Sequence, residues 1–192
     1  VNEAPYKAAP KAPILYIKPR NTQVAQGDLV IVPSDVVELQ IGATLGLVIG
    51  KTASKVSLSE ALNYVAGFTI VNDISVPHDS IYRPSMRFKC RDTFCPIGPV
   101  IVPTQKISNP DHLKMTVSVD GKVVQQTNTS DRIRSVAQLL VDVTEFMTLH
   151  PGDVLSIGIS ANAPLAKAGQ KVAVSIEGIG QLENTLVAEE LV

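Results

Sequence analysis

The alternation of hydrophobic and polar residues is clearest in the second half of the chain. Residues 113–119 place apolar side chains at every second position, the pattern of a strand with one buried face. The pair Asp120-Gly121 follows, and then Val123 and Val124. Because an Asp-Gly pair between two such segments is the strongest short-range hairpin signal, we expect an antiparallel hairpin here.

Shorter apolar segments elsewhere predict further strands. Each is bounded by glycine, proline or polar residues, and each is too short to form a complete helix. The segments are 14–18, 30–32, 45–49, 68–71, 154–159, 172–176 and 182–187.

Two segments have the period of a helix. Ser57 and Glu60 have the spacing of a capping box, and apolar residues at helical spacing follow until Gly67. Ser130 can cap a longer helix, because apolar residues recur on one face of 133–147. We therefore expect two helices.

Strands and helices do not alternate regularly along the chain, which argues against a doubly wound parallel sheet. The pattern predicts an α+β fold with a mixed, mostly β architecture and two helices. We expect one domain over residues 1–192, in which residues 1–13, rich in alanine, proline and lysine, form an extended N-terminal arm.

The composition is that of a globular protein without a strongly charged surface. With 192 residues, 45% hydrophobic and 18% charged, the chain can bury a sizeable core. A net charge of −1 favours neither nucleic acid nor anionic membranes as partners. No apolar run approaches the roughly 20 residues of a membrane helix, and the first residues do not resemble a signal peptide. We expect a cytoplasmic protein.

Cysteine and histidine are too few for several classes of enzyme. Cys90 and Cys95 cannot make a disulfide framework or a four-ligand zinc site, and we expect them to fill space in the core. His78, His112 and His150 lack the spacing of metal ligands. These counts argue against a zinc enzyme, a thiol enzyme and a Ser-His-Asp hydrolase.

Four cations fall within nine residues, at Arg83, Arg87, Lys89 and Arg91. Apolar and basic residues alternate over 86–91, so an extended strand would direct the cations to one face and the apolar side chains inward. Such a cluster favours a small anionic ligand. The alternative interpretation is the solvated outer face of an ordinary strand.

Several short strings of residues resemble the fumarylacetoacetate hydrolase family. Each string alone is common, but together they follow the family's order over roughly residues 14–187. The resemblance implies the family's mixed β roll or sandwich and the pairing of like domains. The strings are 48–51, 64–68, 72–75, 89–94, 96–99, 149–153 and 177–182.

Within the family, residues 6–7, 17–22 and 82–84 resemble the N-terminal-type half of bifunctional isomerase/decarboxylases of homoprotocatechuate catabolism. Two related halves occur there, fused or as separate subunits. The resemblance implies decarboxylation of 5-oxopent-3-ene-1,2,5-tricarboxylate and isomerisation of 2-hydroxyhepta-2,4-diene-1,7-dioate. It implies a small anionic 2-oxo acid as substrate. It also implies a homo-oligomer, or pairing with a homologous C-terminal-type subunit.

Two alternatives remain open beside this interpretation. The chain could be a catalytically degenerate half that supports the assembly of an active homologous subunit. It could also carry another chemistry of the family, such as hydrolysis of an acylpyruvate or decarboxylation of oxaloacetate.

The resemblance implies a divalent cation, Mg²⁺ or Mn²⁺, which stabilises an enolate as a Lewis acid. The family holds it with a Glu-x-Glu pair on a strand and the aspartate of Asn-Asp. Here these positions are Gly42, Thr44 and Asp73, so only one carboxylate remains. Since one carboxylate holds Mg²⁺ poorly, we expect weak or absent metal binding. Gly42→Glu with Thr44→Glu should then restore affinity.

The cationic part of the family's site is retained. Lys89 and Asp92 match the Lys-x-x-Asp string, so the resemblance makes them catalytic, with the lysine stabilising or protonating an enolate. Arg83 is expected to bind a distal carboxylate as a fork. Asp73 has an alternative role as a turn residue that bonds the local backbone. The residues expected to bind substrate are Lys18, Arg20, Arg83 and Asn72.

Overall fold

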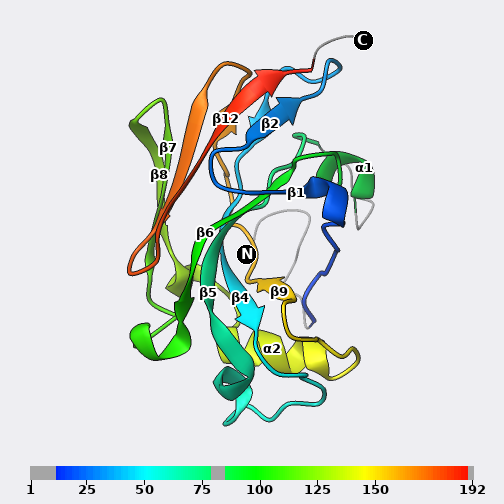
Figure 1. Ribbon diagram of the computed structural model, residues 1–192, viewed down its shortest axis with the longest axis vertical. Coiled ribbons are helices and arrows are strands. Elements are labelled where there is room, and N and C mark those ends of the chain that lie inside the picture. The colour runs from blue at the N-terminus through cyan, green and yellow to red at the C-terminus, as the bar shows by residue number, and fades with distance from the viewer. Residues whose placement is uncertain (1–11, 79–84, 190–192) are drawn as a thin grey trace.

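The computed structural model describes residues 12–78 and 85–189 (Figure 1). Residues 1–11 of the expected N-terminal arm and Arg83 therefore lie outside the described residues.

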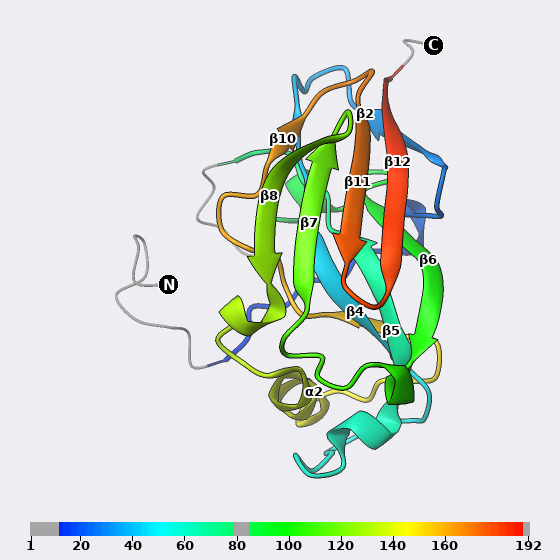
Figure 2. The same ribbon diagram turned by 90° about the vertical axis from the view of Figure 1, so that its left-hand side faces the viewer.

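Two five-stranded sheets form the body of the described chain (Figures 1 and 2). The first sheet has the order β1 (Gln23–Val24), β6 (Cys95–Pro103), β5 (Val65–Asn72), β4 (Ala43–Ile49) and β9 (Val154–Ser156). The second has the order β2 (Leu29–Val32), β12 (Gly180–Ala188), β11 (Lys171–Ile176), β7 (Lys114–Val119) and β8 (Lys122–Asn128). A two-stranded sheet pairs β3 (Leu39–Gln40) with β10 (Leu165–Ala166).

Strand pairing is mostly antiparallel, with parallel pairs between β1 and β6 and between β2 and β12. This confirms the predicted α+β class and the mixed, mostly β architecture. The predicted hairpin joins β7 to β8. Asp120 (φ 49°) and Gly121 (φ 77°) both have positive φ at its turn, as a type I′ hairpin requires.

The longer predicted helix is present, but it begins later than expected. It is α2 (Val136–Thr144), and the side chain of Ser135 accepts a hydrogen bond from the backbone N–H of Gln138 at 3.1 Å. Ser130, the predicted cap, lies instead in a separate short 3₁₀ turn, η4 (Thr129–Asp131). The chain thus forms a separate 3₁₀ turn before helix α2 begins. The remaining 3₁₀ turns are η1 (Arg20–Thr22), η2 (Ala61–Tyr64) and η3 (Thr104–Lys106).

The helix predicted after Ser57 is wrong, because no α-helix forms there. Only the 3₁₀ turn η2 forms, and strand β5 begins directly after it at Val65. Gly67, the expected helix stop, lies within β5. A Cβ there would lie 2.4 Å from the carbonyl oxygen of Val102 on β6, so the glycine allows the two strands to approach each other.

The strand predicted over 86–91 is also wrong, because a short helix, α1 (Met86–Lys89), forms there. The N–H of Cys90 donates to the carbonyl of Met86 at 2.8 Å. The ring of Phe88 stacks on His78. The backbone carbonyl of Phe88 accepts a hydrogen bond from the N–H of Val76 at 2.8 Å. The segment packs on the preceding loop instead of joining a sheet.

The strand expected over residues 14–18 is wrong: these residues have no regular secondary structure and pair with no strand. Pro19, which follows, has no N–H to donate to a ladder.

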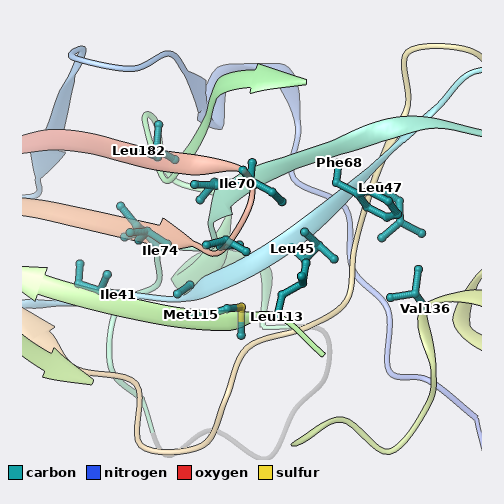
Figure 3. Close-up of a cluster of buried hydrophobic side chains, with 14 of the residues drawn as sticks. Ile41, Leu45, Leu47, Phe68, Ile70, Ile74, Leu113, Met115, Val136 and Leu182 are labelled. Carbon is teal, nitrogen blue, oxygen red and sulfur yellow. The ribbon is translucent and has the colours of Figure 1, made fainter. Parts of the chain in front are cut away.

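The core lies where the two large sheets face each other (Figure 3). Strand β4 is buried along its whole length, and Figure 3 shows its Leu45 near Ile70 of β5 and Met115 of β7. Helix α2 lies at one end of the sheets and contributes Val136 and Leu140 to the same core (Figures 1 and 2). No helix in the described part of the chain is long and apolar enough to cross a membrane.

Candidate functional site

A cavity of about 880 Å³ is lined by residues of β5, β6 and α2 and by the segments 13–18, 131–134 and 152–161. The lining residues of β5 lie at its end and those of β6 at its start, and α2 contributes its apolar side. This volume is in the range of small-molecule sites.

Asp73 directly follows β5 and is a buried charged residue, 6% exposed, in the wall of this cavity. The hydroxyl of Tyr16 donates a hydrogen bond to its Oδ2, and Nζ of Lys18 lies 2.9 Å from its Oδ1. Burial, and then the nearby charge of Asp73, raise the pKa of Tyr16 far above its usual range. The phenol therefore stays protonated and remains a donor.

Lys18 binds the backbone as well as Asp73. Its ammonium donates to the carbonyls of Ile74 (2.6 Å), Lys89 (2.5 Å) and Phe94 (3.0 Å). These three bonds use all three N–H groups of an ammonium. Oδ1 of Asp73 therefore receives a nearby positive charge but no hydrogen bond, and it has no other donor among the described residues.

Lys89, at the end of α1, has its ammonium over the ring of Tyr16. Its ammonium is 4.7 Å from the centre of the Tyr16 ring, a cation–π distance. Lys89 is not among the described residues that line the cavity, whereas Tyr16, Lys18 and Asp73 are.

Three other predicted site residues that the structure describes, Arg20, Asn72 and Asp92, do not line the cavity. Asp92 and Arg20 are exposed, and Oδ1 of Asp92 accepts from the side chain of Asn21 at 2.6 Å. Asn72 is buried, and its Oδ1 accepts from the N–H of Gly42 at 3.1 Å. The structure thus brings together Lys18, Asp73 and Lys89 of the predicted set.

The residues at the family's metal-ligand positions do not fit a divalent cation. A Cβ on Gly42 would lie 2.3 Å from the carbonyl oxygen of Asp73, so the expected restoration by Gly42→Glu is wrong: the backbone leaves no room. Thr44 is fully buried in β4. Within 12–78 and 85–189, no group of three or more His, Cys, Asp or Glu could hold a metal ion.

Neither cysteine is a reactive thiol. Cys95 is buried in the cavity wall, and burial raises its pKa to about 12. Cys90 is partly buried, and this burial is the main reason that the pKa of its thiol is also raised. Both therefore stay protonated near neutral pH, which removes the thiolate nucleophile.

Sequence reasoning missed most residues of the cavity wall, including the polar side chains of Tyr16 and Arg132. Tyr16 lies two residues before Lys18 in an extended segment, and that spacing could have placed both side chains on one face. Arg132 carries no signal in the sequence. Its Nη1 donates to Oγ of Ser160 at 3.1 Å, and burial lowers the pKa of its guanidinium.

The resemblance to the fumarylacetoacetate hydrolase family implied a mixed β fold and a site that includes Asp73, the residue directly after β5. The model of the family described as "Fumarylacetoacetate (FAA) hydrolase C-terminal" matches residues 1–187, and the chain belongs to this family.

A curated relative supports the group expected within the family. The chain is 41% identical over 187 residues to the 4-hydroxyphenylacetate degradation bifunctional isomerase/decarboxylase of Escherichia coli. The match covers 97% of this chain and 42% of the relative, so the chain spans less than half of the relative's length. The predicted resemblance is confirmed.

Two solved structures have the same fold. The 2-hydroxyhepta-2,4-diene-1,7-dioate isomerase of Mycobacterium marinum has a TM-score of 0.83 and 31% identity, over 95% of this chain and 71% of that chain. The fumarylpyruvate hydrolase of Pseudomonas aeruginosa, in complex with Mn²⁺ and pyruvate, has a TM-score of 0.82 and 26% identity. That match covers 91% of this chain and 78% of the other.

Proposed function

We propose that this chain is one half of an isomerase/decarboxylase that acts on 2-oxo di- and tricarboxylates of homoprotocatechuate catabolism. The reactions are decarboxylation of 5-oxopent-3-ene-1,2,5-tricarboxylate and isomerisation of 2-hydroxyhepta-2,4-diene-1,7-dioate. The observation that carries the proposal is the cavity beside Asp73, in a chain 41% identical to a bifunctional isomerase/decarboxylase.

Asp73 is the base in this proposal. Isomerisation of a 2-hydroxy-diene to a 2-oxo acid removes the proton of the hydroxyl and adds a proton to the carbon chain. Asp73 lines the cavity, and its Oδ1 has no hydrogen-bond donor among the described residues, so we assign the hydroxyl proton to this oxygen. The family resemblance implies Lys89 as the proton donor; its ammonium lies outside the cavity wall, 4.7 Å from the centre of the Tyr16 ring, so it must move past that ring to reach a substrate.

We assign no metal-dependent step to this chain, because Gly42 and Thr44 provide no carboxylate ligands. We assign the divalent cation of the family to a homologous partner half. The length of the curated relative supports such a partner, since this chain matches only 42% of it.

Turnover of 2-hydroxyhepta-2,4-diene-1,7-dioate by the purified chain tests the proposal. We expect little activity from the chain alone, with or without Mg²⁺, and full activity after mixing with the C-terminal-type subunit. If the partner alone is as active as the mixture, this chain takes no part in the reaction.

A second candidate is a structural half without catalysis. The engagement of Asp73 by Tyr16 and Lys18 favours it, because those contacts also explain the centre as a stabilising cluster. Lys89→Met separates the two candidates, since it deletes the charge and keeps most of the side chain. An active half should lose about 10²- to 10⁴-fold in the rate of the assembled enzyme. An unchanged rate would favour the structural half.

A further inference from the structure

Arg132 extends into the cavity wall from a tightly closed turn. In η4, just before Arg132, the N–H of Ser130 donates to Oδ1 of Asn128 at 3.0 Å, and the N–H of Asn128 donates to Oδ2 of Asp131 at 2.9 Å. This reciprocal pair is a capping box. The backbone on the N-terminal side of Arg132 is therefore fixed beside the cavity.

The charge of Arg132 is offset only in part, by the neighbouring carboxylate of Asp131, which lines the same cavity. Among the ion pairs of the described residues none involves Arg132, whereas Arg134 pairs with Asp142 at 2.6 Å. The adjacent carboxylate of Asp131 is already bonded to the backbone of Asn128. The cavity wall thus contains an arginine that forms no ion pair among the described residues.

The geometry of its guanidinium specifies what can neutralise it. Nη1 donates to Ser160, but Nε and Nη2 are shielded from solvent and have no hydrogen-bond partner in the described part of the chain. These two nitrogens lie on the same edge of the guanidinium, and their parallel N–H groups match the two oxygens of a carboxylate.

We propose that Arg132 binds a carboxylate of an elongated dicarboxylate ligand through Nε and Nη2. The assignment rests on the proposed function, and it names the residue that holds the end of the substrate remote from Asp73. The cavity wall also includes Leu139, Val143 and Ile157, which suit the hydrocarbon chain of such a ligand. Because this edge is shielded from solvent, binding requires the guanidinium to turn it toward the cavity, which breaks the bond to Ser160.

Calorimetric titration of the purified chain with heptanedioate, a stable seven-carbon dicarboxylate, tests the assignment. We expect binding by the wild type and a weakening of about 10- to 100-fold in Arg132→Gln, which loses a charged pair of hydrogen bonds. Arg132→Lys keeps the charge without the fork, so it should bind with intermediate affinity. The matched control is Lys122→Gln, which removes an exposed cation outside the cavity wall and should change affinity less than twofold.

Several results would overturn the assignment. They are no binding of heptanedioate by the wild type at millimolar concentration, unchanged affinity in Arg132→Gln, and equal affinity for inorganic phosphate. If Arg132→Gln does not fold, unchanged affinity in Arg132→Lys would overturn it. The proposed function is tested separately, by turnover of the mixed subunits. If the Arg132 variants lose heptanedioate binding but the mixed subunits show no turnover, only the proposed function fails. If turnover is present but the Arg132 variants bind heptanedioate as the wild type does, only the assignment of Arg132 fails.

Discussion

Lys18 is the residue on which the polar centre depends. Lys18→Met would leave Asp73 buried without a cation and three carbonyls without their donor. Removing one partner of a buried pair typically costs about 3–5 kcal/mol, and we expect a loss of that size in the free energy of unfolding, measured by urea denaturation.

Lys171→Met is the matched control for this change. Lys171 pairs with Glu183 at 2.9 Å, but the two side chains are 59% and 33% exposed. Because exposed pairs contribute little, the control should lose less than about 1 kcal/mol. Equal losses in the two variants would show that Lys18 does not stabilise a buried charge.

Single residues of the site were only partly predictable from sequence. Family strings identified Lys18 and Asp73, which the structure joins. Tyr16 and Asp73 are 57 positions apart, and no local pattern reports such a contact. Local strings also pointed to Arg20 and Asp92, but adjacency in sequence does not fix the direction of a side chain, and both are exposed.

At the scale of elements, the start of α2 gives a direct test. Ser135→Ala removes the side chain that accepts from Gln138, and loss of an N-cap costs about 1 kcal/mol. Ser130→Ala, at the position that the sequence favoured, should cost only a few tenths of a kcal/mol. Thermal unfolding of both variants provides the measurement, and the reverse order would place the cap at Ser130.

Elements defined by local periodicity were predictable, and those defined by packing were not. The β7–β8 hairpin follows from alternation and an Asp-Gly turn, which depend on neighbouring residues alone. Gly67 is a residue type common at helix ends, but here it allows β5 and β6 to lie close together. The segment at α1 alternates like a strand, yet Phe88 stacks on His78. Tertiary contacts decided both cases.

At the scale of the whole molecule, we expect association with a second copy or with a homologous subunit. The family resemblance implies pairing, and the neighbouring side chains of Val100 and Ile101 on β6 are 51% and 56% exposed. Burying such apolar side chains favours a partner. Light scattering at micromolar concentration provides the test. A monomer in the presence of the C-terminal-type subunit would contradict the expectation.

The metal-ligand positions allow a prediction for the whole chain. Calorimetry should detect no micromolar affinity for Mg²⁺ or Mn²⁺, since Asp73 is the one carboxylate left of the family's three ligands. Incubation with a chelator should leave the melting temperature unchanged. A fall in that temperature on chelation would reveal a structural metal.

The ammonium beside Asp73 has one property that a bound ion lacks: it is covalently attached to the chain. An ion equilibrates with the surrounding solution, so its occupancy follows the free concentration and any competing species. Lys18 cannot dissociate or be exchanged, and its local concentration is set when the chain folds. The stability of this pocket should therefore be independent of metal supply, and starving a cell of manganese or magnesium should leave the chain as well folded as before.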